Sequence, residues 1–133
     1  AAGAVGLAAA IQYLNTLGME NVHRAEQELT AYLIKGMQSI PHVHLLGSAR
    51  PDNHTGIASF TVDRVHPHDI SEILSSDGID IRAGHHCAQP LHQHLGIPST
   101  ARASVMFYNT VAEVDRFLES VANIRKRMGF GDE

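Results

Sequence analysis

Tryptophan is absent from this chain of 133 residues, and aromatic side chains are few, with four phenylalanines and three tyrosines. The hydrophobic core must therefore be built mainly from alanine, valine, isoleucine and leucine. A basic excess is also absent, because 10 lysines and arginines face 14 acidic residues, for a formal charge of -4. Proteins that grip phosphate backbones need such an excess, so we expect no nucleic-acid partner.

Cysteine occurs once, as Cys87, which excludes an internal disulfide and is typical of a reducing compartment such as the cytoplasm. The longest apolar stretch, residues 1–11, is too short and too rich in alanine and glycine to cross a bilayer, and it lacks the basic flank of a signal peptide. We therefore expect no membrane association. Glycine-rich phosphate loops and a serine-histidine-aspartate arrangement are missing as well.

Apolar periodicity predicts two helices at the start of the chain. The first runs to Leu17, resembles the middle of a buried helix, and is stopped by Gly18. The second is expected to begin at a cap on Asn21 and to end at Pro41. Because nothing before Ala1 offers a helix cap, we interpret residues 1–133 as a single domain of a longer protein, with its N-terminal end truncated.

Further helices are indicated by capping patterns. One should begin at Pro67, with Asp69 near its positive end, and a short helical turn is expected over residues 91–95. Thr110 and Glu113 form a capping box that predicts a final helix.

Four segments have the composition of strands: residues 44–46, 55–65, 79–82 and 102–108. The stretch 83–90 between the last two is predicted to be a loop. This order indicates an α+β fold, in which a small antiparallel or mixed sheet of about four strands is covered by helices.

The densest group of reactive side chains is the segment RAGHHCAQP, residues 82–90. Gly84 and Pro90 bracket a polar loop, and such a loop exposes its side chains. A free thiol has a pKa of about 8.5, and nearby histidine or arginine charge lowers it, which increases the fraction of nucleophilic thiolate. Cys87 is therefore the candidate nucleophile.

Other readings of these residues stay open. Histidines and the cysteine of this region could bind zinc, although adjacent ligands do not easily occupy one tetrahedron; the candidates are His85, His86, Cys87, His92 and His94. Cys87 could instead be an inert buried side chain. The cluster at residues 66–69 is most simply a solvated helix start. Arg102 could form a structural salt bridge or hold a carboxylate.

Several segments share a resemblance to one known family. They are AGAVGLAAAIQYL, GMENVHRAEQELTAYL, HPHDIS, GIDIRAGHHCAQPL, TARAS and FYNTVAEVDRFLESV. In this order they closely resemble the C-terminal part of SufS-type (group II) cysteine desulfurases and selenocysteine lyases. These are pyridoxal-phosphate enzymes of the aminotransferase class V group, with a fold-type I architecture whose small domain lies at the C-terminus.

The resemblance implies roles for individual residues. Cys87 matches the catalytic cysteine, which takes the sulfur of L-cysteine as a persulfide and leaves L-alanine. Arg102 matches the arginine that anchors the substrate carboxylate, and Arg82 the arginine that opens the catalytic loop. His68 matches a histidine that engages the zinc of a SufU-type sulfur acceptor in one branch of the family. A SufU- or SufE-type acceptor, iron–sulfur cluster assembly and a homodimer are implied for the whole enzyme.

The chain also departs from what such an enzyme needs. The lysine that binds pyridoxal phosphate should lie on the upstream domain, because the two lysines present, Lys35 and Lys126, fall inside helix patterns outside the family's lysine context. We therefore expect the chain alone to be inactive, to bind no cofactor and to leave an apolar patch that favours self-association. No role is assigned to His92 or His94, and no metal site is predicted.

Two different kinds of protein remain as alternatives. The chain could be a non-enzymatic histidine/cysteine module that binds metal or carries sulfur. It could also be a purely structural domain with an inert cysteine.

Overall fold

The computed structural model describes residues 1–131 of the chain. Its helices, in chain order, are α1 (Ala2–Leu17), α2 (Met19–Gln38), the short 3-10 helix η1 (Pro51–Asn53), α3 (Pro67–Ser76), α4 (Gln89–Leu95) and α5 (Val111–Arg127). Its strands are β1 (Val43–Leu45), β2 (Ile57–Val62), β3 (Arg82–Gly84) and β4 (Thr100–Ser104). The strands form one sheet in the order β1-β2-β4-β3.

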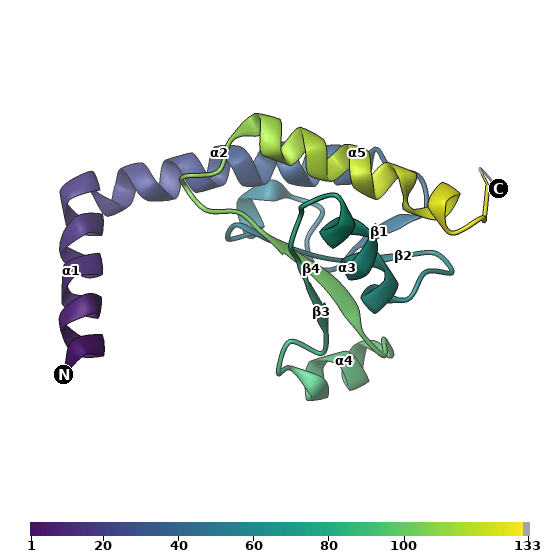
Figure 1. The fold of residues 1–133 in the computed structure, drawn as a ribbon, viewed down its shortest axis with the longest axis horizontal. Coiled ribbons are helices and arrows are strands. Elements are labelled where there is room, and N and C mark those ends of the chain that lie inside the picture. The colour runs from purple at the N-terminus through teal and green to yellow at the C-terminus, as the bar shows by residue number, and fades with distance from the viewer. Residues whose placement is uncertain (132–133) are drawn as a thin grey trace.

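All neighbouring strands of the sheet are antiparallel. Strands β2 and β4 are central, while β1 and the three-residue β3 form the edges. Helices α2, α3 and α5 cover one face of this sheet (Figure 1). The α+β prediction, with about four strands and a helical cover, is therefore confirmed.

The core lies between the sheet and these helices. In β2, Ala58, Phe60 and Val62 are buried, whereas the alternate residues point to the opposite face, as expected from the two-residue repeat of a strand. The helices add apolar residues at intervals of three and four: Leu29, Leu33, Ile34 and Met37 from α2, Ile70 and Leu74 from α3, and Val114, Phe117, Val121 and Ile124 from α5. The sheet therefore has one covered face and one open face.

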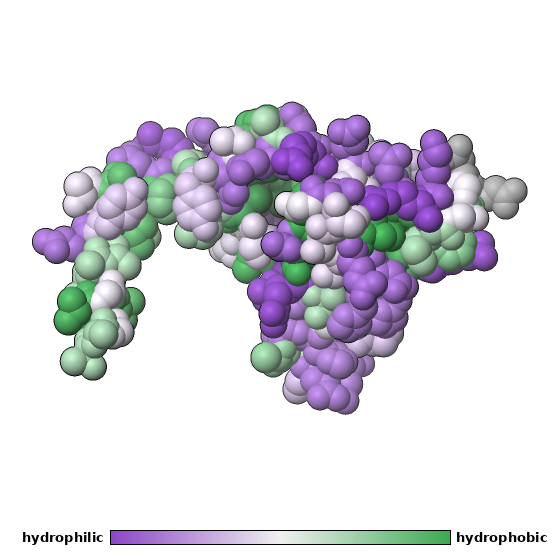
Figure 2. Space-filling model, in the orientation of Figure 1, coloured by the Kyte–Doolittle hydropathy of each residue, from purple (hydrophilic) through white to green (hydrophobic). Residues whose placement is uncertain are grey.

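Helix α1 has the apolar pattern of a buried helix but is exposed, and it forms the apolar patch expected of the chain alone. It has no buried residue, and Val5 and Leu7 are 70% and 63% exposed. After Gly18, which has a φ of 83°, the chain turns sharply, so that α1 projects away from the body of the molecule (Figure 1). Its apolar side chains are visible as a hydrophobic surface in Figure 2. The pattern of the sequence was that of a buried helix, but the described residues provide nothing that covers it.

Several predicted boundaries also require correction. Helix α2 begins at Met19, and Asn21 is not its cap but donates from Nδ2 to the carbonyl of Leu17. The strand predicted at 79–82 pairs only from Arg82, because Ile79 and Ile81 instead pack against the core without ladder partners.

The strand predicted at 102–108 lies earlier, at Thr100–Ser104, so Arg102 occupies its middle rather than its start. The final helix is confirmed, with Thr110 and Glu113 forming both hydrogen bonds of the capping box. Within the described residues 1–131, no helix combines the length and apolar character that a membrane crossing requires.

Candidate active site

Two arginines lie side by side on the open face of the sheet. Arg102 in β4 is paired in register with Arg82 in β3 on one side and with Ser59 in β2 on the other. Its strand neighbours Ala101 and Ala103 are buried in the core, so the alternation of the strand directs Arg102 to the face without helices. Arg82, Arg102 and Ser59 thus form one row across three strands.

The row concentrates positive charge without internal compensation. Like charges directly opposite each other in an antiparallel pair are destabilising. In the described part of the chain, neither guanidinium has an acidic partner, and the buried Nε of Arg102 has no hydrogen-bond acceptor. An anionic ligand with two acceptor oxygens would supply both the negative charge and the hydrogen-bond acceptor that are missing. The planar guanidinium of arginine suits a carboxylate. We call Arg82 and Arg102 the arginine pair.

The cysteine lies on the loop that leaves the same strand. Strand β3 carries Arg82 and ends at Gly84, and Cys87 follows in an exposed turn closed by a 2.8 Å hydrogen bond from the Ala88 N–H to the His85 carbonyl. His86 and Cys87 both adopt left-handed backbone conformations, with φ of 54° and 57°. Two consecutive non-glycine residues in this region are strained and need support from their surroundings.

Three side chains beneath this loop form a hydrogen-bonded network. Thr100, the first residue of β4, is 1% exposed. Its Oγ1 lies 2.9 Å from His86 Nε2 and 3.2 Å from His92 Nε2, and His92 Nδ1 lies 3.1 Å from the Ala88 carbonyl oxygen. The ring of His85 meets that of His92 edge-on at 5.8 Å.

The network lies close to the positive charge of the arginine pair. Burial lowers the pKa of His86, and the charge of Arg102 lowers it further, while a hydrogen bond with the backbone of Thr100 opposes these effects. The neutral form of His86 is therefore favoured.

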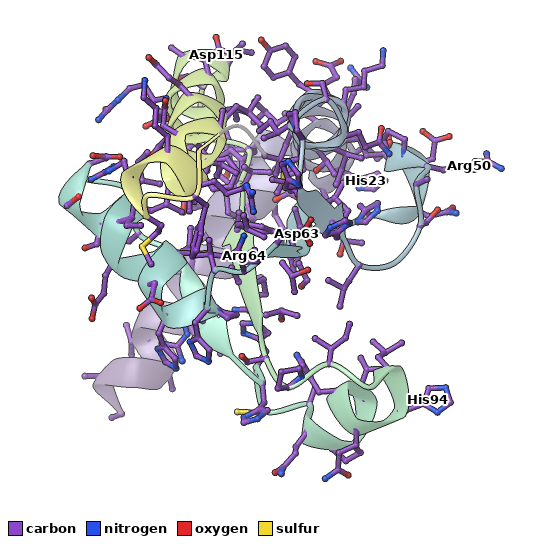
Figure 3. All side chains as sticks on the ribbon, turned by 90° about the vertical axis from the view of Figure 1, so that its right-hand side faces the viewer. His23, Arg50, Asp63, Arg64, His94 and Asp115 are labelled. Atoms are coloured by element: carbon purple, nitrogen blue, oxygen red, sulfur yellow. The ribbon has the colours of Figure 1, made fainter. Side chains whose placement is uncertain are left out.

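The two histidines of α4 have different environments, which the sequence did not reveal. His92 is buried within the network, whereas His94 is exposed and points outward from α4 (Figure 3). His92 thus has contacts within the network that the sequence did not predict. The only sequence signal was its spacing, four residues after Ala88 at the start of a helical turn.

His68 lies apart from these groups, in the first turn of α3. Its ring stacks on that of His66 at 5.4 Å, and its backbone N–H donates to His66 Nδ1 at 3.3 Å. Both histidines are exposed. Within the described residues, His68 has no hydrogen bond or ring contact with the Cys87 loop.

Residues 1–131 contain no group of three histidine, cysteine or acidic side chains that could hold a metal ion. The alternative of a metal-binding module therefore lacks a ligand set in this part of the chain. Lys35 on α2 and Lys126 on α5 are exposed and belong to helices that cover the other face of the sheet. The open face accordingly offers groups for a carboxylate but no lysine for an aldehyde cofactor.

Known proteins similar to this chain share one family. Residues 1–117 match the family model "Aminotransferase class-V". A probable cysteine desulfurase of Streptomyces coelicolor is 40% identical over 128 residues, which are 96% of this chain and 31% of that protein. The chain therefore spans about three-tenths of the length of this relative.

Solved structures agree with this assignment. The apo structure of the cysteine desulfurase from Thermococcus onnurineus NA1 superposes with a TM-score of 0.88 at 38% identity, covering 94% of this chain and 31% of that one. A variant of the protein C-DES, with glycine covalently linked to its pyridoxal-phosphate (PLP) cofactor, gives a TM-score of 0.72 at 28% identity, covering 89% and 28%. The shared sequence and fold show that this chain belongs to the aminotransferase class-V family.

Proposed function

We propose that the protein carrying this chain is a PLP-dependent cysteine desulfurase and that residues 1–133 form its C-terminal small domain. The observation that carries the proposal is the arginine pair on the open face of the sheet, next to the loop that exposes Cys87. The arginine pair supplies an anchor for a substrate carboxylate, and the loop supplies a thiol. The cysteine desulfurases among the similar proteins support this reading.

Arg102 and Arg82 would bind the carboxylate of L-cysteine. Arg102 is held at the centre of the sheet, so its fork offers a fixed direction for the carboxylate oxygens. Fixing the amino acid by its carboxylate leaves the side-chain sulfur free to meet a nucleophile.

Cys87 would then accept the sulfur. Its thiolate attacks the substrate sulfur, a sulfur–sulfur bond forms, and the bond between the substrate's Cβ and sulfur breaks. The electron pair of the broken bond remains with the substrate carbon, which takes up a proton. L-cysteine and the Cys87 thiol thereby give L-alanine and a Cys87 persulfide, so that atoms and electrons balance.

PLP, when bound, serves as an electron sink for bond cleavage at the amino acid's carbons. Its lysine and its phosphate contacts would come from an upstream domain, since no lysine of this chain belongs to the open face. That domain would also cover the exposed apolar side chains of α1. The chain alone is then inactive, and its exposed apolar helix favours self-association.

Finer assignments belong to the same proposal. The exposed His68 would meet an acceptor of the SufU type, and an acceptor of either the SufU or the SufE type would take its sulfur from the Cys87 persulfide. We further propose a homodimeric, cytoplasmic enzyme that supplies iron–sulfur cluster assembly. Selenocysteine would fit the arginine pair as cysteine does, because the pair contacts only the carboxylate.

The proposal is tested on the full-length protein by measuring alanine formed from L-cysteine, together with the visible absorbance of bound PLP. We expect alanine formation, and we expect Cys87→Ser to abolish sulfur transfer while the absorbance of the cofactor remains. A colourless protein that releases no alanine would contradict the proposed function. Sulfur transfer by the Cys87→Ser variant would contradict the role of Cys87, and a sulfur carrier without enzymatic activity would form no alanine.

A further inference from the structure

The loop that carries Cys87 is held by a network of three side chains, one from the loop itself, one from α4 and one from β4. His86 and Ala88 flank the cysteine, and both are tied to the buried Thr100: His86 directly through its ring, and Ala88 through the ring of His92. These hydrogen bonds therefore hold both neighbours of Cys87, the residue whose position matters for sulfur transfer.

The proton positions in this network follow from its partners. A carbonyl oxygen only accepts, so His92 donates to Ala88 from Nδ1, and in the tautomer with its proton on Nδ1 the other ring nitrogen, Nε2, accepts. Thr100 then donates its single hydroxyl proton to His92 Nε2, and its oxygen accepts from His86 Nε2–H. Each ring is thereby fixed in one tautomer.

The backbone at Cys87 needs such support. His86 and Cys87 have φ of 54° and 57°, and side-chain-bearing residues enter this region only when their surroundings compensate for the strain. The backbone supplies a hydrogen bond from the Ala88 N–H to the His85 carbonyl, and the Ala88 carbonyl also accepts the backbone N–H of His92 at 3.1 Å. The side-chain anchors on both sides of Cys87 are those of the network.

We propose that Thr100 and His92 are positioning residues, which hold the Cys87 loop in its strained conformation through His86 and Ala88. As far as sulfur transfer is concerned, this inference rests on the proposed function. The loop geometry itself does not. Thr100 touches neither the arginine pair's ligand nor the thiol in this scheme, and it acts only through the loop.

The hydroxyl of Thr100 can be removed with little change of shape. Thr100→Val deletes both of its side-chain hydrogen bonds, whereas Thr100→Ser retains the hydroxyl and serves as the rescue variant. His94→Gln is the matched control, because His94 is on the same helix as His92 but is exposed and points outward (Figure 3). Thermal melts identify any variant that fails to fold.

Two readouts are measured on the full-length protein. Amide hydrogen exchange is followed in peptides within residues 83–102, the segment that contains the Cys87 loop, His92 and Thr100. Kinetics give kcat and KM for L-cysteine. For Thr100→Val we expect exchange in the loop about tenfold faster and kcat about tenfold lower, as for the loss of two hydrogen bonds. KM should stay within about twofold, since the arginine pair is untouched.

Thr100→Ser should restore wild-type exchange and kcat, and His94→Gln should change neither. A folded Thr100→Val protein with wild-type loop exchange would overturn the inference, as would an equal loss in Thr100→Ser. If Thr100→Val does not fold, His92→Gln is compared with His94→Gln by the same exchange measurement, and equal exchange in the two would overturn the inference. Absence of alanine formation by the wild-type protein would refute the proposed function, while the exchange comparison would still test the positioning role.

Discussion

Arg82 and Arg102 are directly opposed across the antiparallel ladder between β3 and β4. Two guanidinium groups therefore leave the same face of the sheet from adjacent strands. The pair is unfavourable by itself, because like charges face each other without an acidic neighbour among the described residues. A bound anionic ligand makes the same arrangement favourable, because its negative charge compensates the two guanidinium groups. The pair therefore lowers the stability of this face without a ligand and binds the ligand when it is present.

The first prediction concerns the two members of this pair. In the full-length enzyme, Arg102→Ala should raise KM for L-cysteine and lower kcat/KM by about 10- to 100-fold, the loss expected for a hydrogen-bonded charged partner. Arg102→Lys should recover little, because an ammonium lacks the planar fork. Steady-state kinetics measure both variants.

A stability measurement tests the like-charge contact between the two arginines. Without ligand, Arg82→Ala should leave the free energy of unfolding unchanged or raise it by about 0.2–1 kcal/mol, because it removes a like-charge contact. Arg50→Ala is the control, since the side chain of Arg50 is exposed and lies 3.6 Å from Asp52 in a surface pair. Wild-type kinetics in Arg102→Ala would refute the carboxylate role.

The second prediction concerns the entrance to β2. Gly56 has a φ of 64°, and a Cβ added there would lie 2.7 Å from the carbonyl oxygen of Val105. That neighbour is backbone, held by the hydrogen bond from the Val105 N–H to the Gly56 carbonyl. Gly56→Ala should therefore lower the free energy of unfolding by about 2 kcal/mol or more, from backbone strain plus overpacking.

Gly78→Ala is the matched control for this substitution. Gly78 has a similar φ of 75°, but a Cβ there would meet nothing within 4 Å. Its cost should be the backbone strain alone, about 1 kcal/mol. Urea unfolding of the two variants isolates the contribution of the steric contact, and equal losses would show that Val105 moves aside.

The third prediction concerns stability in acid. The hydroxyl of Ser120 donates to Asp77 and lowers the pKa of this carboxyl, and the Arg127 guanidinium, at 2.6 Å, lowers it further. A depressed pKa stabilises the fold above the unfolded value, about 3.9, and the contribution is lost as the pH falls through the lower folded value. Asp77→Asn should therefore flatten the fall in melting temperature below about pH 4.

Asp52→Asn is the control for the loss of stability at low pH, because Asp52 is exposed and its surface pair with Arg50 is long, at 3.6 Å. Melting temperatures between about pH 7 and pH 3 measure the effect. If Asp77→Asn and the wild-type chain lose stability with the same slope, the link between α3 and α5 through Asp77 does not contribute to acid stability.

Local patterns were sufficient for most of the fold. The capping box at Thr110 and Glu113, the proline at the start of α3 and the alternation of β2 depend on neighbours within a few residues, so they could be read from the sequence. Boundaries were less accurate where packing decides. Ile79 and Ile81 have the composition of a strand, yet they contact the core without ladder partners.

The sequence by itself determined the α+β class and made Cys87 and Arg102 candidates, because residue type, capping and periodicity are local properties. Only the tertiary structure decided that Arg82 on β3 is paired with Arg102 on the adjacent strand β4, and that Thr100 joins His86 to His92. It also decided that α1 is exposed. Strand register and burial depend on contacts between residues far apart in the chain, and those contacts follow from how the helices and the sheet pack together.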